Sequence, residues 1–208
     1  MNDAGPRTTA VVPVRALEGS KSRLGSVLDA EERAALVLRL LDRTLTALAA
    51  ADSIGAVIVV SPDPAVLRRA MRRGIRTTHQ RGEGLNDAIR EAARALGQRD
   101  RLLVLPADLP GVSPEALDAV SAAADAAGSP VVVVVPDRHG RGTNALLLDP
   151  PDAIGPAFGA DSRSVHRQRA AAAGAAYREI DGPLSLDIDT PDDLLLAESQ
   201  APDALGVA

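Results

Sequence analysis

The sequence contains no cysteine and no tryptophan, and aromatic residues make up only 1% of its 208 residues. Without thiols, neither a disulfide framework nor a thiolate metal site can form. Hydrophobic residues still make up 46% of the chain, so its core must be built from Val, Leu, Ile and Ala. A chain of this length is long enough to bury such a core as one domain.

A surplus of basic charge is also missing. The net charge is −5, and no Lys/Arg cluster alternates with aromatic residues, so a nucleic-acid surface is not expected. The first ten residues, MNDAGPRTTA, lack the charged-then-apolar pattern of a signal peptide, and no apolar run approaches the length of a membrane span. We therefore expect a cytoplasmic protein with neither a nucleic-acid nor a membrane partner.

Short apolar runs alternate with longer Ala- and Leu-rich stretches. The runs cover residues 9–14, 56–61, 75–79, 101–106, 130–136 and 144–148. Continuous Val, Ile and Leu runs are typical of strands buried on both faces. Helical spacing and capping residues predict helices over 29–50, 84–97, 113–127, 161–173 and 191–198. The alternation predicts an α/β fold with a mostly parallel mixed sheet flanked by helices. We expect one domain over residues 1–208, with a core from about 8 to 198 and flexible ends.

The loop that follows the first apolar run is rich in glycine and basic residues. In folds of this class, ligands bind beyond the carboxyl ends of the strands. Residues 15–25, RALEGSKSRLG, place Gly19, Lys21 and Arg23 there, where backbone N–H groups and cations can surround a phosphate chain. The loop is not a Walker A motif, because Ser20 separates the glycine from the lysine. The alternative is a solvated, flexible basic loop.

Three aspartates follow apolar runs elsewhere in the chain. Asp108 lies in LPADLPG (105–111), and Asp187 and Asp189 lie in SLDIDTPDDL (185–194). If this last segment is extended, both of its first two carboxylates project to one face, and a cation between them makes their repulsion tolerable. The three side chains together predict a Mg²⁺ site. As alternatives, Asp108 would be a helix-capping or turn residue and Asp189 a helix N-cap.

Three further loops carry polar residues at the edges of predicted elements. RGEGLNDAI (81–89) has Gly82 and Gly84 before a helix that opens with Asn86, so it could contact a base or ribose, or it is an ordinary helix N-terminus. Glycines in DRHGRGTNALLL (137–148) allow close backbone approach to a ligand. FGADSRSVH (158–166) places a glycine and a serine at a helix start, which is a natural anion site.

These motifs, in this order, resemble the guanylyltransferases of deazaflavin coenzyme F-420 biosynthesis. The matching pieces are VPVRALEGSKSRL, GLNDAI, ADLP, GRGTNALLL, FGADSRSVH and SLDIDTPDDL. They extend over nearly the whole chain. Members of that family activate phosphoenolpyruvate or 2-phospho-L-lactate with GTP. The resemblance implies a Rossmann-like nucleotidyltransferase fold of the nucleotide-diphospho-sugar transferase type.

The resemblance also implies a role for individual residues. Mg²⁺ would be held by Asp108, Asp187 and Asp189, which with Lys21 form the catalytic set. The phosphorylated acid would be bound by Thr143, Gly159 and Ser162. The nucleotide would contact Arg15, Gly19, Lys21, Arg23, Gly84, Leu85, Asn86 and Pro106. Two positions depart from the family pattern: Arg15 stands where a lysine is expected, and Ala107 where glycine is common.

The implied reaction condenses GTP with phosphoenolpyruvate, giving enolpyruvoyl-diphospho-guanosine and pyrophosphate. The product would pass to a downstream transferase. An Ala- and Arg-rich, actinobacterial-like composition favours phosphoenolpyruvate over 2-phospho-L-lactate. Alternatives are a nucleotidyltransferase for another phosphorylated substrate, such as a sugar phosphate, and a nucleotide sensor without turnover. The sequence leaves the oligomeric state open, a homodimer included.

Overall fold

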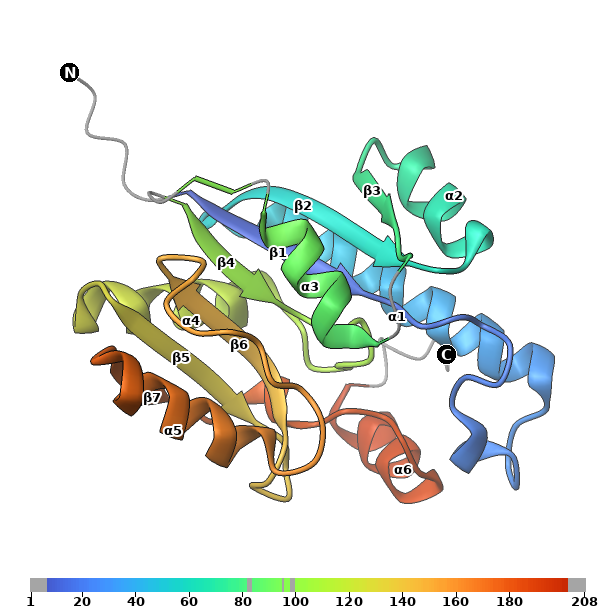
Figure 1. Cartoon of the computed structure of the whole chain (residues 1–208). Coiled ribbons are helices and arrows are strands. Elements are labelled where there is room, and N and C mark those ends of the chain that lie inside the picture. Colours follow the sequence, from blue (N-terminus) through green and yellow to red (C-terminus); the bar gives the residue numbers. More distant parts are fainter. Residues whose placement is uncertain (1–6, 82–83, 95, 98–99, 202–208) are drawn as a thin grey trace.

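The computed structural model describes residues 7–81, 84–94, 96–97 and 100–201, which build a seven-stranded sheet with helices on both faces (Figure 1). The strands are β1 (Thr8–Pro13), β2 (Ile54–Ser61), β3 (Arg76–His79), β4 (Arg101–Val104), β5 (Val131–Pro136), β6 (Thr143–Asp149) and β7 (Ala176–Glu179). The α-helices are α1 (Ala30–Ala50), α2 (Pro64–Arg72), α3 (Leu85–Ala93), α4 (Pro114–Ala127), α5 (Ser162–Ala173) and α6 (Pro191–Gln200). Two short 3₁₀ helices, η1 (Ser22–Leu24) and η2 (Pro183–Ser185), complete the set.

The strand order in the sheet is β3-β2-β1-β4-β6-β5-β7. β1 pairs in parallel with β2 and β4, β2 with β3, and β5 with β7, whereas β6 runs antiparallel to both β4 and β5. The predicted mostly parallel mixed sheet is confirmed. Because β6 is reversed, its first residue lies at the same edge of the sheet as the carboxyl ends of the parallel strands.

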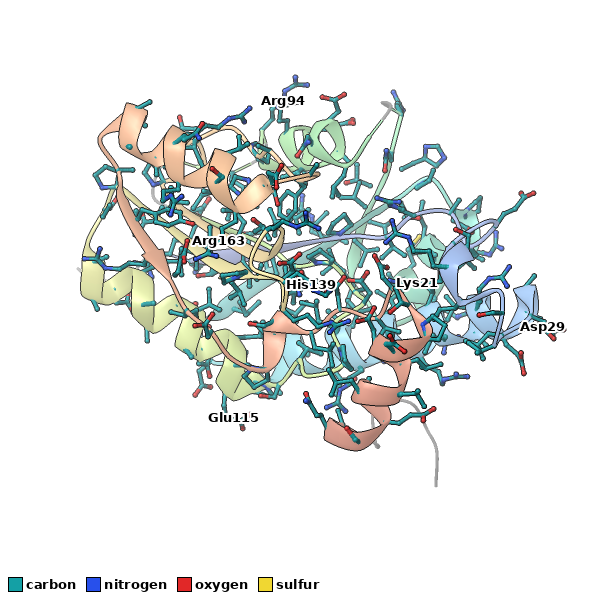
Figure 2. All side chains as sticks on the ribbon, turned by 90° about the horizontal axis from the view of Figure 1, so that it is seen from below. Lys21, Asp29, Arg94, Glu115, His139 and Arg163 are labelled. Carbon is teal, nitrogen blue, oxygen red and sulfur yellow. The ribbon has the colours of Figure 1, made fainter. Side chains whose placement is uncertain are left out.

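Two buried clusters cover the two faces of the sheet. In one, Val12 and Val133 of the sheet pack with helices α1, α2 and α4. In the other, Val11 and Val132 pack with helices α3 and α5. The alternation of neighbouring residues between faces is the period of two that β-strands impose. Figure 1 shows α3 and α5 in front of the sheet with α1 and α4 behind it. In the turned view of Figure 2, Arg94 and Glu115 mark the two outer layers.

A third buried cluster joins the beginning and the end of the chain. Leu24 of η1 and Leu36 of α1 pack there with Leu186, Ile188 and Ala197. The segment from Leu186 to Asp189 is not part of the sheet, yet its apolar side chains alternate inward as predicted: Leu186 is 7% exposed and Ile188 is fully buried. This packing fixes which way the intervening carboxylates face.

Most elements were predicted, with a few corrections. Helix α3 ends at Ala93 rather than at Gly97, because Arg94 is its C-cap and closes the last turn with its N–H on the Arg90 carbonyl at 3.2 Å. Helix α2 and strand β7 were not predicted from the sequence. The N-cap Asp63 and the following Pro64 were available signals for α2. β7 is a short, partly exposed strand at the sheet edge, so it lacks a strong apolar run.

The structure confirms capping residues at the starts of the predicted helices 29–50 and 113–127. Asp29 and Glu32 form a reciprocal capping box at the start of α1, and Ser113 caps α4. Among the described residues, no helix is both long enough and apolar enough to cross a membrane.

Candidate active site

A cavity of about 580 Å³ opens at the edge of the sheet where β1, β2 and β4 end and β6 begins. Its lining includes these predicted site residues: Arg15, Lys21, Gly84, Leu85, Pro106, Asp108, Thr143, Gly159, Ser162, Asp187 and Asp189. Segments from nearly the whole length of the chain therefore meet at one place. Another cavity of about 440 Å³, beside α3 and residues 151–156, has none of these residues in its lining.

Lys21 lies at the acidic side of this cavity. Its Nζ donates to Asp108 Oδ2 at 2.6 Å and to Asp189 Oδ1 at 2.9 Å, and only 9% of its side chain is exposed. Burial alone would lower the pKa of Lys21, but the charges and hydrogen bonds of the two aspartates outweigh it and raise the pKa. Lys21 is therefore a fixed cation that joins two of the three predicted metal ligands. Figure 2 places it between the N-terminal part of the chain and α6.

Asp187 is the least charge-compensated of the three aspartates. Burial first, and then the charges of Asp108 and Asp189, raise its pKa to about 6, against smaller opposing effects of Asn144 and Lys21. Asp108 and Asp189 therefore add electrostatic repulsion to the effect of burial on Asp187. A further positive charge beside Asp187 would relieve that repulsion.

Backbone contacts hold the last of these segments against the loop that carries Asp108. The Ile188 N–H donates to the Asp108 carbonyl at 3.1 Å. Gly111 permits the approach, because a Cβ there would lie 2.1 Å from the Pro183 carbonyl oxygen. From β6, Asn144 Nδ2 donates to the Leu184 carbonyl at 3.0 Å. The two acidic segments are therefore tied together by the main chain.

The alternative assignment of Asp189 as a helix N-cap is wrong. The N-cap of α6 is Thr190, which forms a reciprocal capping box with Asp193. The Asp189 carboxylate instead accepts from Lys21 and lies 3.9 Å from Arg23 Nη1. Asp189 is thus available to the cavity.

The opposite side of the cavity carries hydroxyl groups. Thr143, the first residue of β6, and Ser162, the first residue of α5, are 7% and 1% exposed. Ser162 Oγ donates to Thr143 Oγ1 at 3.2 Å, and His166 Nδ1 lies 3.0 Å from the same oxygen. Gly159 is exposed at the cavity rim with a φ of 135°, a conformation that favours glycine. The hydroxyls are neutral donors, and the one carboxylate in the lining near them, that of Asp137 beside Gly142, accepts the Arg141 N–H at 2.8 Å.

Some predicted nucleotide-binding residues are not in the cavity lining. Gly19 is exposed, with a φ of 69° and open space where a Cβ would be. The Arg23 side chain is 75% exposed. Asn86 donates through Nδ2 to the Phe158 carbonyl at 3.0 Å and accepts the Phe158 N–H on Oδ1 at 2.8 Å. Its amide thus orients the Phe158 backbone. Gly82 lies outside the described residues.

Asn144 and His166 contact predicted site residues but were not assigned from the sequence, although both stand in the quoted motifs. Asn144 directly follows Thr143 and lies 3.4 Å from Asp187 Oδ1. His166 ends the motif FGADSRSVH and is fully buried. Their proximity to Asp187 and Thr143 depends on tertiary packing. The sequence offered only their position beside predicted ligands as a signal.

The carboxylates do not form a ready metal site in this arrangement. Within the described part of the chain, no three His, Cys, Asp or Glu side chains are grouped so that they could hold a metal ion. The Lys21 ammonium instead lies between Asp108 and Asp189. The carboxylate chemistry nevertheless suits a hard divalent cation, and the raised pKa of Asp187 marks a place where positive charge is short.

Comparison with known proteins places the chain in a family. Residues 8–198 match the family described as "Guanylyl transferase CofC like". The chain is 48% identical to a phosphoenolpyruvate guanylyltransferase of Sphaerobacter thermophilus over 199 residues, 94% of each chain. It is 45% identical to the protein of that name from Rubrobacter xylanophilus over 194 residues, 91% of this chain and 93% of the relative.

A solved structure agrees with the fold. A protein of Desulfovibrio desulfuricans G20, provisionally assigned as a nucleotide-diphospho-sugar transferase, superposes with a TM-score of 0.71 at 18% identity. The superposition covers 91% of this chain and 85% of that one, and confirms the predicted fold type. The family match extends over the cavity and all of its predicted ligands, so this chain belongs to the CofC-like guanylyl transferase family, whose members are nucleotidyltransferases.

Proposed function

We propose that this protein transfers the guanylyl group of GTP to phosphoenolpyruvate, releasing pyrophosphate, in the biosynthesis of coenzyme F-420. A phosphate oxygen of the acid attacks the α-phosphorus of GTP. The bond from that phosphorus to the oxygen bridging to the β-phosphate breaks, and pyrophosphate leaves. The substrate follows from the names of relatives at 45% and 48% identity that cover more than nine-tenths of the chain.

The observation that carries this proposal is the division of the cavity into two unlike sides. One side holds Lys21 among Asp108, Asp187 and Asp189. The other holds the hydroxyl pair of Thr143 and Ser162. An arrangement of cation and carboxylates suits a triphosphate with its counter-ions, and neutral O–H and N–H donors suit a small carboxylate. Two anionic substrates can therefore lie side by side in one cavity.

The reaction does not require a strong general base, because the attacking phosphate oxygen is already an anion. The difficulty is to bring two polyanions together in line. Lys21 supplies one fixed positive charge at the acidic side of the cavity, and Arg15 is a second cation in the cavity lining. Thr143 and Ser162 bind the acid without adding a second positive charge. The residues of the protein thus act by positioning and by charge compensation.

A divalent metal, which nucleotidyltransferases of this kind typically use, fits the acidic side. Asp108, Asp187 and Asp189 would hold it, with Mg²⁺ the ion that matches carboxylate oxygens and phosphates. When bound, the ion supplies charge neutralisation for the triphosphate. Asn144 would keep Asp187 directed toward it, since its Nδ2 lies 3.4 Å from that carboxylate. Lys21 would then be free to share its charge between the carboxylates and the nucleotide phosphates.

The guanine base would be read at the part of the cavity formed by Gly84, Leu85 and Pro106. The main-chain N–H groups of Gly84 and Leu85 and the Pro106 carbonyl can distinguish the oxygen and amino group of guanine from the edge of adenine, whereas the Leu105 N–H is already donated to the Val11 carbonyl. The Asn86 amide, already bound to Phe158, would act by holding the neighbouring acid-binding loop. Gly19 and Arg23, outside the lining, would contact the outer phosphates.

Pyrophosphate release tests the activity directly. The protein is mixed with Mg²⁺ and every pairing of GTP or ATP with phosphoenolpyruvate or 2-phospho-L-lactate. A coupled downstream transferase traps the labile product, which mass spectrometry identifies. We expect release mainly with GTP and phosphoenolpyruvate. Release mainly with 2-phospho-L-lactate would identify that acid as the substrate in place of phosphoenolpyruvate. Release with another phosphorylated acceptor would identify a different nucleotidyltransferase. Binding of GTP without release of pyrophosphate would indicate a sensor.

A further inference from the structure

His166 is a fully buried residue of α5 that contacts the acid-binding side of the cavity without lining the cavity. Its Nδ1 lies 3.0 Å from Thr143 Oγ1, and its Nε2 lies 3.0 Å from the Ala157 backbone nitrogen. Ser162 Oγ lies 3.2 Å from the same threonine oxygen. The imidazole therefore connects the backbone of the 157–159 loop to the hydroxyl pair.

The backbone contact fixes the tautomer of this ring. A main-chain N–H can only donate, so Nε2 must present its lone pair to Ala157. A neutral imidazole then carries its hydrogen on Nδ1. The ring is neutral near pH 7, because burial, followed by the charge of Arg169, lowers the pKa of His166 to about 4. His166 therefore donates its Nδ1 hydrogen to Thr143.

The position of the Ala157 N–H is itself held by neighbouring contacts. The next residue, Phe158, is bound through both its N–H and its carbonyl by the side chain of Asn86. The Phe158 ring meets the imidazole edge-on, with ring centres 5.5 Å apart at 73°. The loop is thus held by Asn86 independently of its contacts with the imidazole.

We propose that His166 is a positioning residue that forces the hydroxyl pair of Thr143 and Ser162 to present a donor hydrogen to the cavity. The count of hydrogens gives the reason. The imidazole, the threonine and the serine hold one hydrogen each, and the His166–Thr143 and Thr143–Ser162 contacts consume two of the three. The remaining O–H must point outward, where an anionic acid can accept it. With the hydrogen on Nε2, two hydrogens would serve two contacts and none would be left.

This inference rests on the proposed role of Thr143 and Ser162 in binding the acid. It adds that their donor character is imposed by a residue that touches neither substrate. A hydrogen bond to a charged group contributes roughly 1.5–3 kcal/mol, which corresponds to about a tenfold to hundredfold change in affinity. Loss of the histidine donor should therefore appear in the KM for the acid.

The first test is direct observation of the tautomer. The protein, labelled with ¹⁵N-histidine, is measured by long-range ¹H–¹⁵N correlation NMR between pH 6 and pH 8. The sequence holds three histidines, His79, His139 and His166, so the variants His79→Gln and His139→Gln assign the signals. We expect one neutral ring with its hydrogen on Nδ1 throughout this range. A ring protonated on Nε2, or one that titrates in this range, would overturn the proposal whatever the activity of the protein.

The second test compares two variants, each of which keeps the hydrogen bond made by one of the two imidazole nitrogens. The amide of His166→Gln reaches the level of Nε2, so it can accept from Ala157 but cannot donate to Thr143. The amide of His166→Asn lies at the level of Nδ1 and can still donate to Thr143. We expect His166→Gln to raise the KM for the acid by about tenfold or more, with the KM for GTP unchanged within about twofold. His166→Asn should stay closer to wild type, and the reverse order would contradict the proposal.

A double-mutant cycle shows whether the effect passes through the threonine. If His166 acts by orienting Thr143, then His166→Gln combined with Thr143→Val should be no worse for the acid than Thr143→Val alone. Additive losses would show that the histidine has only a structural role. If Thr143→Val leaves the KM for the acid unchanged, both the proposed acid site and this inference fail. If wild type shows no turnover, the proposed function fails and the tautomer measurement still decides the inference.

Discussion

Lys21 illustrates how this site places opposite charges in contact. It is the N-cap residue of η1, with a left-handed φ of 50°, a conformation that non-glycine residues adopt infrequently. Such strain is found where surrounding contacts over-determine the backbone. Here the overdetermining contacts are the two hydrogen bonds from its Nζ to Asp108 and Asp189. The lysine thereby orients carboxylates that would otherwise repel each other.

Replacement of the carboxylates tests the acidic side residue by residue. We expect Asp108→Asn and Asp187→Asn each to abolish turnover while the fold stays intact, because each change removes a charged ligand without changing the shape of the side chain. Pyrophosphate release measures turnover, and circular dichroism together with thermal unfolding measures folding. Near-normal activity in either folded variant would remove the metal assignment.

The raised pKa of Asp187 gives a prediction about stability in the absence of metal. Its folded pKa of about 6 exceeds the ordinary value near 3.9, so the folded protein binds the extra proton between those two values. Stability therefore falls as the pH rises through this window, and it is lowest where Asp187 is charged. We expect Asp187→Asn in EDTA to be more stable than wild type at pH 7.5, by about 1–2 kcal/mol after allowance for solvent screening.

Urea unfolding at two pH values checks this sign. At pH 4, wild-type Asp187 is protonated in the folded state, so the difference between the variant and wild type should nearly vanish. Glu198→Gln is a suitable comparison, because Glu198 is exposed on α6 and lies outside the cavity lining. The raised pKa of Asp187 would be contradicted if the difference in free energy of unfolding between Asp187→Asn and wild type did not depend on pH. It would also be contradicted if the variant were less stable than wild type at pH 7.5.

The hydroxyl pair makes a separate prediction for the acid half of the cavity. We expect Thr143→Val and Ser162→Ala each to raise the KM for the phosphorylated acid, since each removes one hydrogen bond to an anion, worth roughly 1.5–3 kcal/mol. The KM for GTP should change little. Steady-state kinetics with each substrate varied in turn separates the two. An effect confined to GTP would move these residues to the nucleotide half.

At the scale of elements, the reversed strand β6 is what brings the two halves of the site together. It lies between β4 and β5 and runs against both. Its first residues therefore face the cavity, while its last residue, Asp149, lies at the opposite end of the strands. There Arg101 at the start of β4 donates to Asp149 at 2.7 Å and to Asp125 of α4 at 2.7 Å. This ion pair secures the register of β6 at the end away from the cavity.

The buried Arg101 contact should matter for stability and not for catalysis. Arg101 and Asp149 are each 7% exposed, and removal of one partner from a buried pair leaves an uncompensated charge that costs about 3–5 kcal/mol. We expect Arg101→Met to lower the free energy of unfolding by an amount of that order, with KM values near wild type at a temperature where the variant is folded. Chemical denaturation measures it.

A matched control is Arg90→Met, which breaks the exposed pair of Arg90 with Asp87 on α3. Exposed pairs contribute roughly 0–1 kcal/mol, so this variant should stay close to wild type. If the two variants lose similar stability, the difference in burial is not what makes the Arg101 contact important.

At the scale of the whole molecule, the cavity is assembled from loops that are far apart in sequence. Residues around 15–21 and 106–108 follow parallel strands, residues 142–144 open the reversed strand, and residues 187–189 return from the C-terminal region. No single segment makes the site. A measurement of nucleotide preference therefore tests how all of these loops are arranged around the cavity.

We expect GTP to be preferred over ATP by at least about two orders of magnitude in kcat/KM. A site that hydrogen-bonds one base edge rejects the other base strongly, because its buried polar groups would be left without partners. The measurement is pyrophosphate release with each nucleotide at matched Mg²⁺ and acid concentrations. Equal rates would contradict guanine selection while leaving metal-dependent nucleotidyl transfer possible.

Local patterns in the sequence were sufficient for most of the fold. Apolar runs identify strands such as β5, whose Val131–Pro136 is buried throughout, and caps such as Asp29 and Ser113 mark helix starts. These features depend on neighbours along the chain, so periodicity and capping chemistry reveal them. The edge strand β7 was not predicted, because a short, half-exposed strand has too few apolar residues to form a recognisable pattern.

The sequence also indicated which residue types serve the site, but their contacts were decided by tertiary structure. Asp108 and Asp187 are far apart in the chain, and they are brought together by tertiary contacts such as the close approach at Gly111 and the Ile188 N–H on the Asp108 carbonyl. The contact of His166 with Thr143 depends on how α5 packs against β6. Local propensities act over a few residues, whereas such contacts are set by packing and register across the sheet, so the direction of a hydroxyl hydrogen is fixed only in the folded protein.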